Sequence, residues 1–116
     1  MAAIQRHGVT ARYADKVVHG GTVYLVEVAT TTDADIGRQT AQVLASIERQ
    51  LQEVGSDKSC LLMATVYLKD FSDAPVFNAA WEAWLPAGCA PVRACVRADL
   101  AHPGYRVEIA LTAAVR

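Results

Sequence analysis

The sequence has few cysteines and no long apolar run, and both shortages exclude whole classes of protein. Its three cysteines, Cys60, Cys89 and Cys95, are odd in number and lack a CxxC spacing, so neither a disulfide framework nor a zinc site is expected. The three histidines are scattered, and none stands at ligand spacing from another candidate, so no metal is expected. No stretch approaches about 18 uninterrupted apolar residues, and the N-terminal MAAIQRHGVTARYADK lacks the apolar core of a secretion signal. We therefore expect a cytoplasmic protein with free thiols and no membrane partner.

An excess of charge of either sign is also missing. Eleven Lys and Arg residues stand against twelve Asp and Glu residues, which gives a net charge of −1 without a basic run. Nucleic acid is therefore not an expected partner. The 53% hydrophobic content of these 116 residues is ample for a core, and no linker interrupts the chain. We expect a single domain over residues 1–116.

The first half of the chain predicts a β-hairpin and a helix. The β-rich runs 16–19 and 22–28 are separated by Gly20-Gly21, which can adopt the positive φ angles of a primed turn. After Asp33 or Asp35, either of which can cap a helix, apolar residues recur at spacings of three and four up to Gly55. Glycine tolerates the left-handed conformation just past a helix, so we expect the helix to end there.

The second half predicts a strand, a helix and two further strands. Residues 61–68 (LLMATVYL) are apolar on both faces, Leu62, Ala64, Val66 and Leu68 on one and Leu61, Met63, Thr65 and Tyr67 on the other. A helix follows from a cap at Ser72 or Asp73 to Pro86, with Phe77, Ala80, Trp81 and Trp84 on one face. The segments 91–98 and 105–114 are the last two strands.

The predicted order is β-β-α-β-α-β-β, an α+β fold with a mostly antiparallel sheet. Two helices can cover only one face of such a sheet. The other face carries Leu61, Met63 and Tyr67, so a lone subunit would leave a sizeable apolar patch in water. We expect identical subunits to bury this face in a closed ring.

Polar residues alternate with apolar ones in the last two predicted strands. If the apolar sets of both strands face the helices, the opposite face carries Arg93, Cys95, Arg97, Arg106 and Glu108. An antiparallel pairing around residues 99–104 would then place Arg93 opposite Glu108. Such a pair either forms a salt bridge between subunits or lies in a pocket. In the pocket, Arg93 would bind a substrate carboxylate through two N–H donors, and Glu108 would handle a water or a proton. Cys95 beside them, without a histidine partner, is more typical of an inert packing group than of a nucleophile.

Consecutive blocks of the sequence resemble the RidA family, also called YjgF, and cover nearly the whole chain in order and with compatible spacing. The blocks are GTVYL at 21–25, QTAQVLASIERQLQEVGSD at 39–57, ATVYLKD at 64–70, FNAAWEAW at 77–84, PVRACV at 91–96 and YRVEIALTAA at 105–114.

The resemblance implies a chorismate-mutase-like fold and a homotrimer, its three sheets forming an inner barrel with a ligand cleft at each subunit interface. It implies hydrolysis of 2-imino and enamino acids, such as 2-aminoacrylate, to 2-keto acids and ammonia without a cofactor. The expected partners are therefore small 2-imino and 2-keto carboxylates. A ribonuclease role has been attached to some relatives, but the neutral charge and the lack of a His-based acid/base pair argue against it here.

The resemblance also implies roles for single residues. Arg93 resembles the arginine that anchors the substrate carboxylate, and Glu108 resembles the glutamate that positions the attacking water. Cys95 matches a cysteine that borders the pocket mainly through its backbone. Tyr13 looks like the tyrosine that closes over the ligand, and Asn78 resembles the asparagine at the cleft rim. From the residues alone, Tyr13 fits an interface aromatic equally well, and Asn78 fits a solvated helix position.

One short segment departs from the family pattern. Where the family typically has Ser-Gly-Gln after the hairpin strand, this chain has Val26-Glu27-Val28. Val26 therefore stands at a substrate-binding position without a hydroxyl, while Glu27 should alternate away from it in a regular strand. An imine deaminase is the leading hypothesis, and the alternative is a non-catalytic trimeric member that binds small carboxylates.

Overall fold

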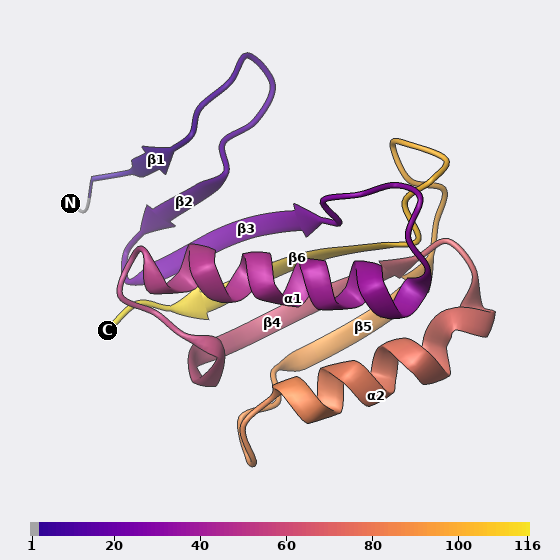
Figure 1. Cartoon of the computed structure of the whole chain (residues 1–116). Helices are drawn as coiled ribbons and strands as arrows, with labels where there is room; N and C mark the ends of the chain where they lie inside the picture. Colours follow the sequence, from indigo (N-terminus) through magenta and orange to yellow (C-terminus); the bar gives the residue numbers. More distant parts are fainter. Residues whose placement is uncertain (1–2) are drawn as a thin grey trace.

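Six strands form one sheet in the computed structural model, which describes residues 3–116 (Figure 1). The strands are β1 (Gln5–His7), β2 (Lys16–His19), β3 (Thr22–Val28), β4 (Leu61–Leu68), β5 (Val92–Arg97) and β6 (Val107–Ala114). Their order across the sheet is β1-β2-β3-β6-β4-β5, and every neighbouring pair is antiparallel except β4 and β5. The predicted α+β class is confirmed, with the short edge strand β1 as an unpredicted addition.

The predicted hairpin and first helix are present where the local signals put them. Gly20 and Gly21 connect β2 to β3 with φ angles of +61° and +81°. Helix α1 (Ile36–Gln52) begins after Asp35, whose carboxylate accepts a backbone N–H from the first turn at 2.8 Å. Gly55, with φ +79°, turns the chain just after the helix.

Helix α2 (Ala74–Trp84) buries the aromatic face that the sequence predicted, with Phe77 and Trp81 in the core. A short 3-10 turn, η2 (Phe71–Asp73), precedes it, and η1 (Lys58–Cys60) precedes β4. Asp73 occupies the cap position but makes no capping hydrogen bond. Its carboxylate bonds Arg106 instead, which is described with the site below.

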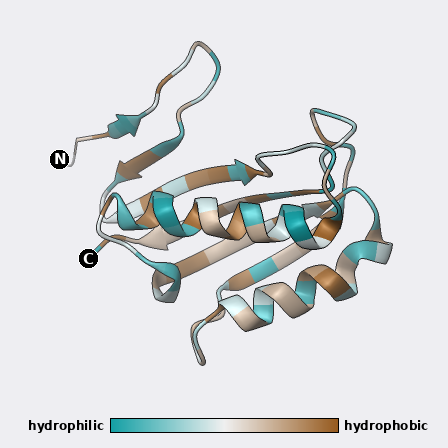
Figure 2. Ribbon diagram, in the orientation of Figure 1, coloured by the Kyte–Doolittle hydropathy of each residue, from teal (hydrophilic) through white to brown (hydrophobic). Residues whose placement is uncertain are grey.

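The core lies between the two helices and one face of the sheet, which we call the helix face. The buried strand residues on this face are Val23, Leu25, Ala64, Val66, Leu68, Val107, Ile109, Leu111 and Ala113. The predicted orientation of the last strand is thus confirmed. In Figure 2, β1 is hydrophilic whereas most of β3 is hydrophobic, which fits a peripheral and a central strand.

The other face of the sheet, which we call the open face, is covered by no helix of residues 3–116. It exposes large apolar side chains from three strands, Tyr24, Val26, Met63, Val92 and Val96. One residue assigned to it from the sequence lies elsewhere. A β-bulge between Leu61 and Met63 turns Leu61 into the core and leaves Leu62 45% exposed, which reverses the predicted faces of these two leucines.

The predicted antiparallel pairing of the last two strands is wrong. β5 pairs with β4 in parallel, and β4 lies between β5 and β6. Arg93 therefore pairs with Ala64 across the sheet, while Glu108 pairs with Tyr67 and Val28. The physical reason is that α2 carries the chain over the sheet, and a strand–helix–strand unit places its two strands side by side in parallel.

The predicted faces of β5 are also reversed. Cys95 pairs with the buried Val66, so Arg93, Cys95 and Arg97 share the helix face, and the apolar residues of β5 lie on the open face. Alternation along β5 does not distinguish the two faces, because both faces of this sheet accept apolar side chains. At an edge strand, a long charged side chain can also run along a helix and keep its head in water.

Gly104 permits close contact between two loops near the end of the sheet. A Cβ placed there would lie 2.3 Å from the carbonyl oxygen of Thr32. We expect Gly104→Ala to lower the free energy of unfolding by about 1–3 kcal/mol, because backbone has to shift. Urea denaturation at fixed protein concentration measures this. Gly37→Ala is the control, since its Cβ would meet neighbours only at 3.7 Å or more; an equal loss in both variants would contradict the steric explanation.

Within residues 3–116, no helix has the length and apolar character needed to cross a membrane.

Candidate functional site

The residues singled out in the sequence form two groups on opposite faces of the sheet. Arg93 and Cys95 lie on the helix face of the edge strand β5, which packs beside α2. Tyr13, Val26 and Glu108 line one cavity at the open face. The prediction that Arg93 and Glu108 share a face within one chain is therefore wrong.

Arg93 is held against the aromatic face of α2. Its guanidinium carbon lies 5.9 Å from the centre of the Phe77 ring and 5.8 Å from that of Trp81, within the range of cation–π attraction. These two rings are stacked on each other, with 6.0 Å between their centres. Among residues 3–116, no hydrogen bond or ion pair uses the Arg93 side chain, and the residue is exposed. Its planar donor fork is thus localised but free to take an anion.

Two other predicted site residues lie in this part of the fold. Asn78 follows Phe77 on α2, and its side-chain oxygen is buried without a hydrogen-bond partner in the described structure. Cys95 is partly buried and packs against the core. This placement agrees with a packing role for the thiol.

The cavity at the open face has a volume of about 560 Å³. Its walls come from the loop between β1 and β2, from β3, and from the connection into β6; the lining residues are Tyr13, Ala14, Asp15, Val26, Glu27, Val28, Ala101, Tyr105 and Glu108. Tyr13 is 64% exposed in a loop closed by hydrogen bonds to Thr10, including one of 2.7 Å from the Thr10 N–H to the Tyr13 carbonyl. Val26 is 53% exposed, and Glu108 lies opposite Val28 in the register.

Glu27 turns away from Val26, as strand alternation predicted. Its Oε1 lies 3.4 Å from the Nε2 of Gln50 on α1. Gln50 also accepts a 2.6 Å hydrogen bond from the buried Lys16, which bridges to Glu53 at 2.6 Å. The Lys16 ammonium lowers the pKa of Glu53. These contacts tie β2 and β3 to α1 and so fix one wall of the cavity.

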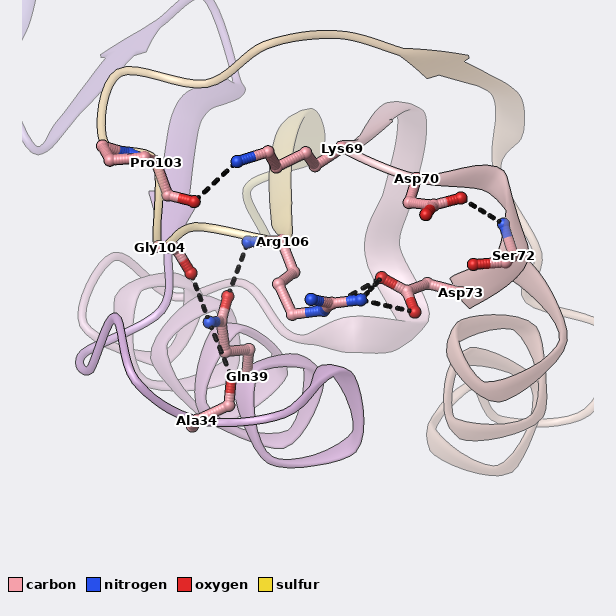
Figure 3. A network of polar contacts seen from close by, with 9 residues as sticks. All are labelled: Ala34, Gln39, Lys69, Asp70, Ser72, Asp73, Pro103, Gly104 and Arg106. Atoms are coloured by element: carbon pink, nitrogen blue, oxygen red, sulfur yellow. Dashed lines mark hydrogen bonds and ion pairs between the residues drawn. The ribbon is translucent and has the colours of Figure 1, made fainter.

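A second polar network fixes the connection that leads into β6 (Figure 3). The fully buried Gln39 on α1 donates through Nε2 to the carbonyl oxygens of Ala34, at 3.0 Å, and Gly104, at 2.8 Å. Its Oε1 accepts the backbone N–H of Arg106 at 2.8 Å. Lys69 donates to the Pro103 carbonyl at 2.7 Å. The connection that carries the cavity residues therefore has a defined position.

Arg106 does not share the open face with Glu108, contrary to the sequence prediction. Its guanidinium forms two 3.0 Å hydrogen bonds to the Asp73 carboxylate beside α2 (Figure 3). These bonds raise the pKa of Arg106 above its ordinary value. Nearby, backbone and side-chain hydrogen bonds from Ser72 lower the pKa of Asp70. Arg106 is thus a structural residue of the loop.

The sequence reasoning missed Val28, Ala101 and Tyr105 as cavity residues. Tyr105 shares the odd positions of Val107 and Ile109, and no face was predicted for it from the sequence. It precedes β6, however, so strand alternation does not govern its position. Ala101 lies in a connection without strand periodicity, and no sequence signal of this kind could have found it.

The two groups offer complementary chemistry. The edge group provides a cation with free donors, and the cavity provides one open-face carboxylate among largely apolar walls. No group of three His, Cys, Asp or Glu side chains that could hold a metal is found in the part of the chain that the structure describes.

The chain is similar to known proteins along nearly its whole length. The family model described as Endoribonuclease L-PSP matches residues 3–115. The RutC family protein YoaB of Escherichia coli K12 is 46% identical over 112 residues, which cover 97% of this chain and 98% of that protein. A protein of Acinetobacter baylyi named 3-aminoacrylate deaminase RutC is 31% identical over 81 residues, 70% of this chain and 64% of that protein.

A solved structure matches in fold as well as in sequence. The crystal structure of a YjgF family member from Neisseria meningitidis has a TM-score of 0.93 and 44% identity, and the match covers 98% of this chain and 96% of that one. Since the family model and both whole-length matches span almost all of the sequence, the chain belongs to the YjgF family, also called RidA.

Proposed function

We propose that this protein hydrolyses 2-imino and enamino acids to 2-keto acids and ammonia, at sites that each combine residues of two subunits in a homotrimer. The observation that carries the proposal is the division of the site residues. Arg93 has a free donor fork on an edge strand, and Glu108 stands in a cavity on the other face. A contact between the β5 edge of one subunit and the open face of the next brings the two together.

The open face supports this assembly. Its exposed apolar side chains, Tyr24, Val26, Met63, Val92 and Val96, form a patch of the kind that marks a protein–protein interface. Three subunits in a closed ring give every subunit the same environment and leave no open face in water. The name of the Acinetobacter relative, 3-aminoacrylate deaminase, supports enamine chemistry in the family.

The proposed chemistry needs only placement and one proton acceptor. Arg93 binds the substrate carboxylate through two N–H donors. Glu108 accepts a proton from a water whose oxygen attacks the imine carbon, and the C=N bond becomes a C–N bond as the nitrogen is protonated. Glu108 then transfers the proton of the new hydroxyl to the amino nitrogen, so the C=O bond forms while the C–N bond breaks and ammonia leaves. An imine is already electrophilic, so orientation and proton transfer are sufficient.

The direct test uses 2-aminoacrylate, released by an amino-acid dehydratase. We expect the protein to accelerate the disappearance of the imine and the release of ammonia, measured with and without it. If the protein binds unreactive 2-keto acids such as pyruvate but leaves the imine lifetime unchanged, it is the non-catalytic carboxylate-binding member instead. If it neither binds nor hydrolyses, the proposal is wrong.

A further inference from the structure

The residues that line the open-face cavity indicate which substrate side chains fit there, an inference that rests on the proposed function. Besides Tyr13, the aliphatic or aromatic side chains of Val26, Val28, Ala101 and Tyr105 line the cavity. Val26 is 53% exposed in the single chain and belongs both to this lining and to the open-face patch. This wall offers contact area to an apolar ligand group, and the phenols of Tyr13 and Tyr105 are the side-chain hydroxyls that the lining contains among residues 3–116.

The charged residues of the cavity are all acidic. Asp15, Glu27 and Glu108 belong to its lining, and among residues 3–116 no Lys, Arg or His lines it. Glu27 turns toward Gln50, and the Asp15 carboxylate lies against Gly8 beside the β1–β2 loop, which leaves Glu108 as the carboxylate on the open-face strands. In the proposed trimer the neighbour's Arg93 is occupied by the substrate's own carboxylate. A second carboxylate on the substrate would meet negative charge and apolar surface.

We propose that the site selects 2-imino acids with a hydrocarbon side chain of three or more carbons, and that Val26 is a specificity-determining residue. A substrate such as the leucine-derived imine, 4-methyl-2-iminopentanoate, removes its isobutyl group from water against Val26, Val28 and Tyr105. Each added methylene that is buried in an apolar pocket raises kcat/KM for the longer substrate relative to the shorter one. The aspartate-derived imine brings an unpaired carboxylate to the same place and is rejected.

The test compares three imines that amino-acid oxidases generate from leucine, alanine and aspartate, with catalase present to remove peroxide. Semicarbazide captures whatever imine the protein leaves, and the absorbance of the semicarbazone gives the rate. We expect kcat/KM for the leucine-derived imine to exceed that for the alanine-derived imine at least about tenfold. The aspartate-derived imine should be the poorest of the three.

Val26→Thr tests the assigned residue because it keeps the shape of valine and adds a hydroxyl. The leucine-to-alanine ratio of kcat/KM should fall about fivefold or more, because the hydroxyl loses hydration beside a hydrocarbon. Val76→Thr makes the same change at an exposed position of α2, outside the cavity lining and the open face, and should leave the ratio unaltered. Hydrolysis of all three imines at similar kcat/KM, or an equal effect of both variants, overturns this inference and leaves the proposed function standing. Failure to hydrolyse any imine overturns the proposed function itself.

Discussion

Arg93→Lys should lower kcat/KM for imine hydrolysis at least about tenfold, which corresponds to about 1.4 kcal/mol of transition-state binding. Lysine keeps a cation near Phe77 and Trp81 but replaces the planar fork by a point charge, so bidentate binding of the carboxylate fails. Steady-state kinetics with 2-aminoacrylate measure the loss. Affinity for pyruvate, measured by calorimetry, should decrease as well.

Arg97→Lys is the matched control for this change. Arg97 lies two residues along β5 on the same face, is exposed, and lies outside both proposed halves of the site. Its substitution should leave kinetics, binding and mass unchanged. If Arg93→Lys also equals wild type in both assays, Arg93 is a structural residue and the carboxylate site lies elsewhere.

Met63→Lys should dissociate the assembly. Met63 is 53% exposed in the single chain, near the middle of the open face, where the proposed trimer buries it. An ammonium group without a partner costs several kcal/mol in such an interface. Sedimentation at micromolar concentration should show the mass of one chain for the variant and of three chains for wild type.

Val76→Lys provides the comparison for Met63→Lys. Val76 is 48% exposed on α2 and lies outside the open face, so lysine there should leave the mass unaltered. A wild-type monomer would contradict the proposed assembly outright. A Met63→Lys variant with an unchanged mass and melting temperature would show that the open face is not the interface.

Local signals in the sequence were sufficient to predict most of the elements. Gly20-Gly21 predicted the hairpin turn. Asp33 or Asp35 and Gly55 predicted the ends of α1, and Asp35 is the cap. Spacing predicted an apolar face of α2 that includes the buried Phe77 and Trp81. Each of these signals acts over a few residues. They therefore remain valid whatever the rest of the chain does.

The arrangement of β5 depended on tertiary structure and was predicted wrongly. The alternation of Arg93 and Cys95 with apolar neighbours indicates two different faces but not which of them meets the helices. That choice could be made only if one face were polar, and the open face of this sheet also carries apolar side chains such as Val26, Met63 and Val96. The order of β4, α2 and β5 did hold a usable signal, since strand–helix–strand units favour parallel neighbours.

The candidate site could be predicted in its residues but not in its geometry. The resemblance to the family selected Arg93, Tyr13, Val26 and Glu108. The structure then separated them into a β5 edge and an open-face cavity. A sequence alone does not indicate that two residues act together only across a subunit boundary. The role of Tyr105 in the cavity could not be predicted for a different reason, since Tyr105 lies outside the regular strand.

Mixed trimers test the two-subunit site most directly. Arg93→Ala and Glu108→Gln, each inactive alone, are combined by co-expression with two different tags, and tag capture verifies that both variants share one trimer. About three quarters of randomly assembled trimers hold both variants, and one site in each such ring draws an intact Arg93 and an intact Glu108 from neighbouring subunits. The account predicts recovery of about a quarter of wild-type activity. Verified mixed trimers that remain as inactive as the separate variants would contradict it, because Arg93 and Glu108 would then have to act within one chain.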